Sequence, residues 1–547
     1  MVISLQIISF FTINLTMSSK TVSERVSVET ENSNILAQYE GNIDELAKLD
    51  KPWYKYGYLV RLNLLIFLCT LTSTNNGYDG SMLNGLQSLS SWQKAMSHPT
   101  GATLGALSNG NTFGAILSAV CSSYLSDRFG RKYTIMGGQF ITIIGACLQG
   151  ASTNYAFFLC SRFVIGFGSG IATIPSPSII SEISYPTHRP TATAFYNCCW
   201  YLGALIAAWV TYGTRTLPSA YSWKIPSYLQ GAIPVIQIAL FFMVPESPRY
   251  LVSRGRVDEA EAVLTKWHGG GSSDERTLKL VRFEMKEIEA ALESEKERNQ
   301  TKYSDFLTIP SFRKRLFLCI FTATFMQLSG NGLISYYLNL VLNSIGITEE
   351  KKQLELNGWL MFFNLIMASV ASSVASMFRR RSMFLLCIGL MLVFFVIWTA
   401  LSAVNQQRNF EQKGLGTGVL AMIFLYYAAY DIGANGIAVL YVTEILPYSH
   451  RTKGYNIFNF WIQVVVLFNG FVNPIAMKAI TWKYYIVYCC VLAVELTVVY
   501  FFYPETSGYS LEEVAQVFGD DNLTTINFIQ QVSSKPEAEH IEVSEKV

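Results

Sequence analysis

The chain has little charge for its length. Of its 547 residues, 15% are charged and 51% are hydrophobic, and the mean hydropathy is +0.28. A soluble globular domain has about a quarter of its residues charged. The sequence therefore lacks the polar residues that would cover a water-facing surface, which favours a protein embedded in a membrane.

Other signals are also missing. The net charge of +2 and the pI near 7.9 give no indication of a nucleic-acid partner. The ten cysteines show no metal-ligand spacing, and packing is their expected role. No nucleophile–base pair or phosphate loop stands out, so we expect no enzyme, cofactor or metal site. Residues 2–15 are apolar, but no basic residue precedes them and no small-residue cleavage site follows. We therefore expect no signal sequence, with Met17 as an alternative start.

What the chain does have is a series of long apolar runs. About 20 residues of helix cross a hydrocarbon layer of ~30 Å. Twelve such runs predict an all-α membrane protein with twelve transmembrane helices in two sets of six. They lie at residues 58–80, 105–126, 133–151, 155–178, 192–213, 226–244, 314–337, 357–378, 382–403, 416–441, 452–475 and 482–503.

Two stretches of sequence occur twice. Residues 182–189 (EISYPTHR) reappear as residues 444–451 (EILPYSHR), and residues 245–247 (PES) reappear as residues 504–506 (PET). Each copy follows a comparable set of apolar runs, so the chain reads as one membrane unit duplicated in tandem. Two similar halves that rock around a site at their interface are typical of a carrier.

The organisation and orientation follow from charge. We expect an N-terminal tail (1–57), a first half (58–244), a helical linker (245–312), a second half (313–503) and a C-terminal tail (504–547). Basic residues gather in three short loops that fall on one side, which the positive-inside rule predicts to be the cytoplasm. Both tails and the linker lie on that side. The charged linker is either a plain connection or a lid that braces a closed state.

Asp79 is the most informative single residue, because it stands in the first apolar run, at its end. An acid in the bilayer costs roughly 2.5 to 3.5 kcal/mol. Arg162, inside the fourth run, is its expected partner. At about 1.5 Å per helical residue, Asp79 lies about 27 Å beyond Arg61 at the inner edge, and Arg162 lies about 12 Å below the outer loop at Asn154. Both residues are therefore expected in the outer half of the bilayer. Protonation would release the pair, as proton coupling requires. The alternative is an acid at a wet helix end and a structural arginine that reaches the interface.

Acids and bases from both halves gather on the predicted cytoplasmic side. Pairs between them would hold the inner mouth shut and break when it opens, and weak solvated pairs suit such a gate. The alternative explains the bases by topology alone, but leaves the matched acids unexplained. The candidate gate residues are Asp127, Arg128, Arg131, Glu182, Arg189, Glu246, Arg380, Glu444, Arg451 and Glu505.

Amides and tyrosines inside the runs are candidates for a substrate path. Amides match the hydroxyl groups of a sugar, and aromatic rings match its apolar face. Any one of them could instead join helices by hydrogen bonding. The candidates are Asn197, Gln327, Asn331, Tyr336, Tyr337, Asn364, Asn435, Gln463 and Asn469.

Together these motifs resemble the sugar porter family of the major facilitator superfamily. The resemblance covers about residues 55–515 and rests on NGYDG at 76, DRFGRK at 127, PESPR at 245, SGNGLISYY at 329 and PETSGYSLEE at 504, with Arg162, Arg189 and Arg451 in their family contexts. SGNGLISYYLN and residues 473–488 are most similar to the fungal lactose-permease-like branch. The resemblance implies the twelve-helix major facilitator fold and alternating access.

The resemblance also assigns roles to single residues. It implies proton symport from an acid at Asp79, and sugar contacts from Asn197, Gln327 and Asn364. Departures from the family pattern are Met326, Gly332 and Ala434 in the pocket, and Ser123 and Arg379 at the cytoplasmic turns. Shortened contacts in the pocket suggest a ligand longer than glucose.

The sequence thus predicts a proton-coupled sugar symporter of the plasma membrane that imports a disaccharide of the lactose or cellobiose type. Its expected partners are sugar, proton and lipid bilayer, with no required protein partner. Alternatives are a carrier of a monosaccharide, a polyol or quinate, and a sugar sensor that does not transport.

Overall fold

The computed structural model describes residues 47–218, 220–272, 274–298, 302–374, 378–447, 450–507, 514, 517 and 518. Within them, the side chains at 120, 190, 294–298, 372–374, 413, 434–436 and 452 are outside the description. Every regular element in this part of the chain is a helix, as the composition predicts. Most of both predicted tails falls outside the described residues.

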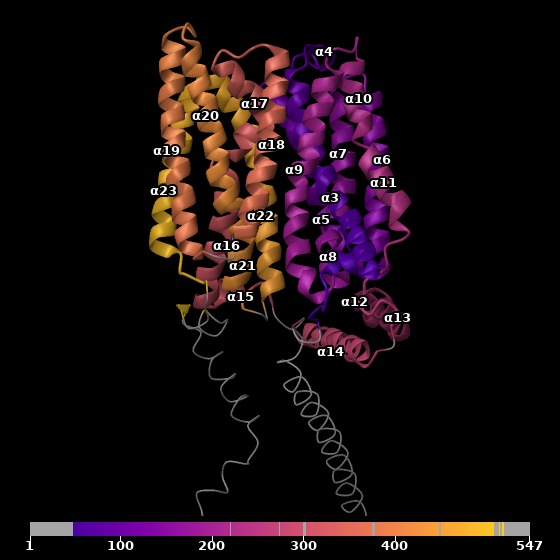
Figure 1. The fold of residues 1–547 in the computed structure, drawn as a ribbon. Helices are drawn as coiled ribbons and strands as arrows, with labels where there is room; N and C mark the ends of the chain where they lie inside the picture. The colour runs from indigo at the N-terminus through magenta and orange to yellow at the C-terminus, as the bar shows by residue number, and fades with distance from the viewer. Residues whose placement is uncertain are drawn as a thin grey trace, which may run out of the picture.

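Two groups of long helices stand side by side (Figure 1). The indigo-to-magenta group is the N-terminal half, and short α4 (Ser90–Ala95) marks its end away from the linker. Its long elements are α3 (Gly57–Ser88), α5 (Ala102–Phe129), α6 (Arg131–Ala151), α7 (Tyr155–Thr173) with α8 (Pro175–Ile183), α9 (Arg189–Thr214), and α10 (Tyr221–Leu229) with α11 (Ala232–Phe241).

The orange-to-yellow group is the C-terminal half, which repeats this plan. Its fourth member is interrupted by one π-helical turn, η4 (Asp431–Asn435). The others are α16 (Pro310–Leu328) with α17 (Asn331–Ser344), α18 (Glu350–Val374), α19 (Arg380–Gln407), α20 (Lys413–Tyr430) with α21 (Gly436–Ile445), α22 (Arg451–Ile480) and α23 (Tyr484–Phe502).

Hydropathy marks most of these helices as membrane spans. Nine segments of the described chain are long and apolar enough to cross a bilayer, and the last of them, Lys453–Phe502, contains both α22 and α23. Helix α5 and the short helices α10 and α11 lie outside these nine, yet they pack against α7 and α6 within the bundle. The protein is a multi-pass membrane protein of two six-helix halves.

The first span is longer than its apolar run. The expectation that it ends near residue 80 is wrong, because α3 continues to Ser88. The added turns carry Asn84 and Gln87, and both are buried against the C-terminal half. Hydropathy underestimates such a helix, since its polar side chains are satisfied by protein rather than by water.

Small residues bring the helices of the N-terminal half into backbone contact. A Cβ atom at Gly77 would lie 1.8 Å from the Trp200 carbonyl oxygen, and one at Gly203 would lie 1.8 Å from that of Thr74. Only glycine allows α3 and α9 to approach this closely. This seam fixes α3, and therefore Asp79, within its half.

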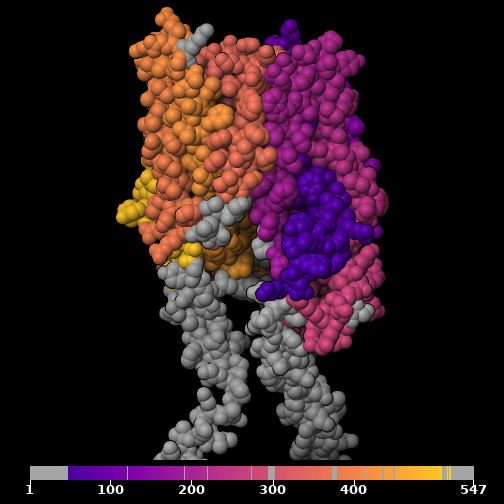
Figure 2. All heavy atoms as spheres, in the orientation of Figure 1, coloured from indigo at the N-terminus to yellow at the C-terminus, as the bar shows by residue number. Residues whose placement is uncertain are grey.

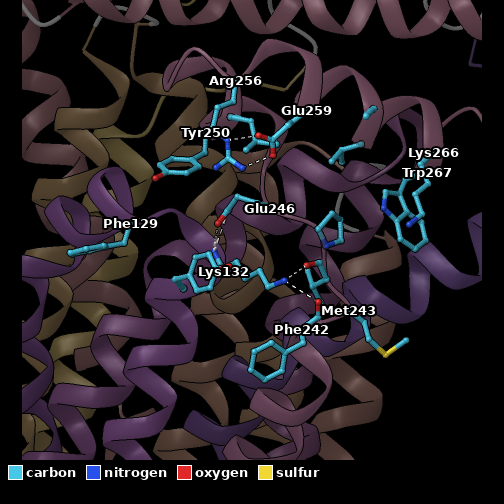
Figure 3. A pocket seen from close by; sticks show the side chains of 16 residues that line it. Phe129, Lys132, Phe242, Met243, Glu246, Tyr250, Arg256, Glu259, Lys266 and Trp267 are labelled. Carbon is cyan, nitrogen blue, oxygen red and sulfur yellow. Dashed lines mark hydrogen bonds and ion pairs between the residues drawn. The ribbon is translucent and has the colours of Figure 1, made fainter.

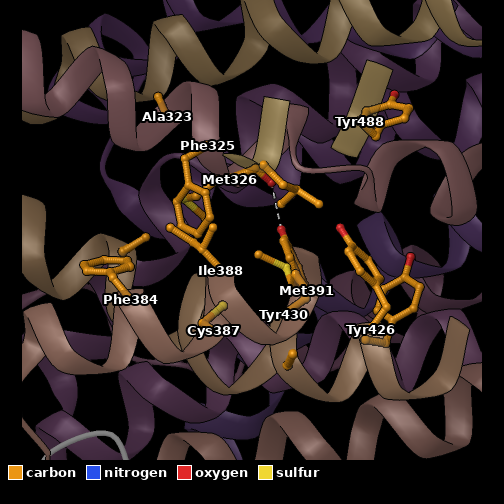
Figure 4. Close-up of a cluster of buried hydrophobic side chains, with 14 of the residues drawn as sticks. Ala323, Phe325, Met326, Phe384, Cys387, Ile388, Met391, Tyr426, Tyr430 and Tyr488 are labelled. Carbon is orange, nitrogen blue, oxygen red and sulfur yellow. Dashed lines mark hydrogen bonds between the residues drawn. The ribbon is translucent and has the colours of Figure 1, made fainter. Parts of the chain in front are cut away.

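Aromatic and sulfur side chains fill the C-terminal half. Figure 4 shows Tyr426 and Tyr430 of α20 near Met391 of α19 and Met326 of α16. Tyr430 donates a hydrogen bond to the carbonyl oxygen of Met326 at 2.9 Å. The core of this half is therefore built from large side chains that also carry polar groups.

The first three linker helices pack below the N-terminal half (Figure 1 and Figure 2), whereas the last one lies below the C-terminal half against α16. The linker contains α12 (Pro248–Ser253), α13 (Val257–Trp267), α14 (Glu275–Arg298) and α15 (Asp305–Thr308). Tyr250 donates a hydrogen bond to the carbonyl oxygen of Arg128 at 3.1 Å. The loop between α5 and α6 is thus attached to the first linker helix.

Candidate functional site

A buried ion pair lies inside the N-terminal half. Arg162 Nη1 of α7 is 2.5 Å from Asp79 Oδ1 of α3, and each residue is 2% exposed. Asp79 lies within α3, not at its end, so the alternative of a wet helix terminus is excluded. The geometry brings together the two residues that the sequence predicts as partners.

Two amides complete the shell around Asp79. Asn111 of α5 donates to Asp79 Oδ2 at 2.5 Å, and Gln230, at the end of α10, donates to Asp79 Oδ1 at 2.8 Å. Three donors therefore stabilise the ionised carboxylate. The side-chain oxygens of both amides have no hydrogen-bond partner within the described protein. Sequence analysis missed Asn111 and Gln230, because the only feature that could have indicated them was a polar side chain within a helical segment.

The two halves meet beside this network. A Cβ atom at Gly80 would lie 3.3 Å from Trp200 of α9 and 3.8 Å from the ring of Tyr336 of α17. Tyr336 is close enough to Asp79 and Arg162 to interact electrostatically with both. One side chain of the C-terminal half therefore faces the charge pair of the N-terminal half.

A kink in α17 provides backbone partners for the end of α3. Tyr337 has φ −139° and ψ 32°, which are not helical values. Gln87 donates to the freed carbonyl oxygen of Tyr336 at 2.9 Å, and Asn84 Oδ1 accepts from the N–H of Leu338 at 3.0 Å. Asn339 donates back to the Gln87 carbonyl oxygen at 3.2 Å. These bonds close the halves together on the side away from the linker.

Contacts nearer the surface strengthen this closure. Glu350 of α18 accepts a hydrogen bond from the N–H of Ser90 at 3.1 Å. Lys478 of α22 donates to Thr100 at 3.0 Å. The structure is therefore a state in which the side opposite the linker is shut.

The predicted substrate residues of α16 and α17 lie close to this interface. Asn331 Nδ2 donates to the Tyr430 hydroxyl at 2.8 Å, whereas its Oδ1 has no hydrogen-bond partner within the described protein. Gln327 is partly exposed, and its carbonyl oxygen accepts from Asn469 Nδ2 at 2.5 Å. Asn331, Gln327 and Asn469 thus form one polar group on α16, α17 and α22.

The remaining predicted amides differ in their surroundings. Asn364 of α18 is fully buried, and neither its amide nitrogen nor its oxygen has a hydrogen-bond partner within the described protein. Gln463 is partly exposed and Asn197 is exposed. The side chain of Asn435 lies outside the described residues. Asn364 retains the full hydrogen-bonding capacity of its amide for a ligand or water.

The predicted gate residues of the N-terminal half pair within that half. Arg131 Nε lies 3.3 Å from Glu182, and Arg131 Nη1 lies 3.6 Å from the largely exposed Asp127. Glu246 accepts hydrogen bonds from the backbone N–H groups of Arg131 and Lys132 at the start of α6, at 3.1 and 3.3 Å. The carboxylate thereby caps the helix.

Glu246 lies beside a pocket of about 440 Å³ between the α5–α6 loop, the end of α11 and the linker helices (Figure 3). Burial raises the pKa of the Glu246 carboxyl, although backbone N–H donors and the nearby Arg131 act in the opposite direction. The hydrogen bonds that cap α6 therefore hold this acid in a place where its charged form is poorly solvated.

The C-terminal half repeats the arrangement. Arg380 Nη2 lies 3.2 Å from Glu444, and Glu505 accepts from the backbone N–H groups of Arg380 and Arg381 at 2.8 and 3.2 Å. The duplicated motifs thus build the same structure twice. For these residues, the described ion pairs join side chains of one half rather than side chains of opposite halves.

Arg189 connects the N-terminal half to the linker. Its Nη2 lies 3.0 Å from Glu284 of α14, which is buried and also lies 2.7 Å from His268 Nδ1. The other ring nitrogen of His268 lies 3.1 Å from the Ile183 carbonyl oxygen. Arg451, the counterpart of Arg189, begins α22. Sequence analysis found Arg189 but missed His268 and Glu284, because nothing in a charged linker indicates which acid is buried.

Two similar six-helix halves that meet beside a buried charge pair, with one side closed and duplicated charge motifs on the other, define a membrane transporter. The comparisons with known proteins agree. A family model described as "Sugar (and other) transporter" matches residues 65–518. The chain belongs to the sugar porter family of the major facilitator superfamily (MFS).

Relatives and solved structures are consistent with this family. The chain is 30% identical over 416 residues to the MFS-type transporter oryC of Aspergillus oryzae, covering 74% of this chain and 75% of that protein. It is 27% identical over 416 residues to the low-affinity glucose transporter HXT3 of Saccharomyces cerevisiae, covering 74% and 72%. The inward-open xylose transporter XylE of E. coli is similar in fold, with TM-score 0.68, 20% identity, and coverage of 83% and 99%.

Proposed function

We propose that this protein is a proton-coupled sugar symporter of the plasma membrane that imports a disaccharide of the lactose or cellobiose type by alternating access. Both termini and the linker then lie in the cytoplasm. The observation that carries the proposal is the buried Asp79–Arg162 pair with its two amide donors. A buried acid with a fixed cationic partner provides a site where one proton changes the balance of charge.

The amides allow Asp79 to be satisfied in both protonation states. Asn111 and Gln230 now donate to the carboxylate, and each has a side-chain oxygen without a partner in the described protein. Once Asp79 is protonated, its hydroxyl becomes a donor, and rotation of either amide presents an oxygen that accepts it. Arg162 is then released to other acceptors, which changes the helix packing that is favoured.

Tyr336 provides a connection between this proton site and the cargo. It lies beside Gly80 and the charge pair, on the same helix as Asn331. The amide group of Asn364 and the side-chain oxygens of Asn331 and Asn469, which have no partner among the described residues, supply hydrogen-bonding capacity for sugar hydroxyls. These amides all belong to the C-terminal half, and Tyr336 borders the N-terminal half at Gly80.

Support for a disaccharide comes from the pocket side chains and the branch resemblance. A Cβ atom at Gly332 would lie 3.4 Å from the Asn469 amide nitrogen, so glycine leaves the space beside Asn469 open. Met326 replaces an amide of the hexose carriers, which removes one polar contact. Both changes favour a longer ligand over a tightly held hexose.

The charge clusters on the linker side fit a gate that is open in this state. The opposite side is closed, and the described pairs of Arg131 and Arg380 lie within their own halves. Alternating access requires the two sides to close in turn. We expect these side chains to gain partners in the opposite half when the linker side closes.

Uptake in a yeast strain without its own sugar transporters tests the proposal. Labelled mono- and disaccharides, a polyol and quinate are supplied over a range of external pH. Asp79→Asn should abolish uphill accumulation while exchange of labelled for unlabelled sugar continues. Asp258→Asn, the same substitution at an exposed acid of the linker, is the matched control.

Three outcomes would contradict parts of the proposal. Intact accumulation in Asp79→Asn removes proton coupling. Uptake restricted to a hexose, a polyol or quinate removes the disaccharide. A sugar response without any uptake, lost on deletion of residues 516–547, identifies a sensor.

A further inference from the structure

A second buried acid lies in the C-terminal half. Asp431 is 1% exposed and begins η4, the π-helical turn between α20 and α21. It stands 14 residues before the end of α21 at Ile445, about 21 Å from the linker side. An acid at this depth is costly to bury and is usually functional. Sequence analysis did not select it.

Asp431 is bonded across the interface between the halves. Tyr201 of α9 donates a hydrogen bond to Asp431 Oδ1 at 2.6 Å. Tyr201 lies 12 residues into α9, about 18 Å from the linker side, so the two helices place the partners at the same depth. The bond joins the N-terminal half to the C-terminal half near the middle of the bilayer.

The C-terminal partner lies on a turn that interrupts a long helix. π-helical turns are rare and are often found at functional sites, where a helix bends. η4 is packed closely, since a Cβ atom at Gly433 would lie 2.2 Å from Cys387 Cβ of α19. Figure 4 shows Cys387 beside Tyr430, the residue that precedes Asp431. The turn is therefore held by α19 on one side and by Tyr201 on another.

The last turn of α20, just before η4, contacts α17, which carries the predicted sugar residue Asn331. Tyr430 accepts a hydrogen bond from Asn331, and the Tyr427 hydroxyl lies 2.6 Å from that of Ser335. Both tyrosines are close enough to Asp431 to interact electrostatically with it. A shift of η4 would consequently move the partners of α17.

We propose that the Tyr201–Asp431 bond is a tether between the halves that stabilises the state closed on the side away from the linker. Asp431 acts as a positioning residue, because it fixes η4 and through Tyr430 the substrate-binding part of α17. A bond shifts a conformational equilibrium only if it is stronger in one state than in the other. The tether must therefore weaken when that side opens. Its link to sugar rests on the proposed function, whereas its conformational effect does not.

The test measures conformation without requiring transport. Ser81 is buried between α3 and α18, where it accepts a hydrogen bond from Asn357 at 3.5 Å, and it becomes accessible only when the halves separate on that side. Ser81→Cys is placed in the full-length protein, which is purified in detergent and labelled with a maleimide. Protein without Ser81→Cys gives the background labelling of the native cysteines.

Tyr201→Phe removes the tether and should raise the labelling rate of Ser81→Cys about three- to tenfold, the effect expected for one buried hydrogen bond. Asp431→Asn keeps an acceptor but loses the charge, and it should give an intermediate rate. The matched control is Tyr503→Phe, which removes a buried hydroxyl that lies 2.6 Å from the Thr322 hydroxyl, within the C-terminal half and away from η4. It should leave the rate unchanged.

The outcomes separate this inference from the proposed function. Parent-like labelling in both Tyr201→Phe and Asp431→Asn overturns the tether, whatever the cargo. An equal increase in Tyr503→Phe also overturns it, because the effect is then general loosening of the core. If Tyr201→Phe does not fold, as judged by gel filtration and thermal melting, the nearly isosteric Asp431→Asn decides. If the variants change the maleimide labelling of Ser81→Cys as expected but the parent protein takes up no labelled sugar, only the sugar assignment is contradicted.

Discussion

The interiors of the two halves are built in different ways. In the N-terminal half, glycines bring backbones together, as at Gly77 and Gly203, and also at Gly166, where a Cβ atom would lie 1.9 Å from the Asn111 carbonyl oxygen. In the C-terminal half, the core consists of large aromatic side chains such as Phe395 and Tyr426, whose ring centroids are 5.5 Å apart. The first arrangement tolerates little movement, because backbones cannot yield.

The two halves also differ in where their helices are bent or interrupted. The C-terminal half contains the break at Gly330, with φ +111°, the kink at Tyr337 and the π-helical turn at Asp431. At the position that matches η4, the N-terminal half has only the junction at Ile174 between α7 and α8, and Ile174 keeps helical backbone angles. Duplication has kept the charged loops of both halves. It has left a rigid half with the ion pair and a bent half with most of the sugar candidates.

The largest effect should come from breaking the ion pair of the rigid half. Arg162→Leu leaves Asp79 buried without its cation and should lower the free energy of unfolding by about 3–5 kcal/mol. Thermal melting of the purified protein measures the loss. The double variant with Asp79→Leu should recover part of it, since no buried charge remains. A double variant no more stable than Arg162→Leu would contradict this account of the pair.

A methyl group in the glycine seam should cost nearly as much. Gly203→Ala places a Cβ atom against the Thr74 carbonyl oxygen, so the helices must separate, and we expect a loss of about 3 kcal/mol. Gly137→Ala in α6 is the control, because a Cβ atom there meets nothing within 4 Å. Equal melting temperatures of the two variants would show that the seam yields and that the N-terminal half is not rigid.

A smaller change is expected in the aromatic core. Tyr426 donates a hydrogen bond to the Ser329 carbonyl oxygen at 2.9 Å, just before the break at Gly330. Tyr426→Phe keeps the ring and loses this bond, so the free energy of unfolding should fall by about 1 kcal/mol. The same melting experiment measures it. A loss as large as that of Gly203→Ala would remove the distinction between the two interiors.

The smallest effect is a dependence on pH at the linker side. Because burial raises the pKa of Glu246 above its ordinary value of 4.5, the folded state binds more protons than the unfolded state between the two pKa values. Stability should therefore fall as the pH rises through that window, and Glu246→Gln should lack this contribution. Melting temperatures of both proteins across the window give the comparison. Parallel curves would contradict the shift.

Much of the fold could be predicted from the sequence, because a bilayer imposes length and polarity on every span. The twelve runs and the duplicated motifs indicated two six-helix halves, and the scarcity of charge identified Asp79 and Arg162 as partners. The length of α3 could not be predicted, since Asn84 and Gln87 look like residues of a loop until another helix satisfies them.

The candidate site was less accessible to prediction. Asn111 and Gln230 carry the same signal as any amide that joins two helices, so sequence alone does not reveal that they meet at Asp79. Asp431 was missed because its partner is a phenol on α9, and no charge pattern indicates such a pair. The sequence also does not specify partners among the acids and bases of the linker side, where the described ion pairs of Arg131 and Arg380 lie within their own halves.

The kink at Tyr337 has a consequence for how carriers of this type diversify. Gln87 and Asn84 close the side away from the linker by binding main-chain groups of residues 336 and 338, not their side chains. Substitutions of these side chains therefore leave the closing bonds intact, and under the proposed function they would change which cargo is accepted. New selectivity can evolve in this pocket without a new mechanism for shutting it.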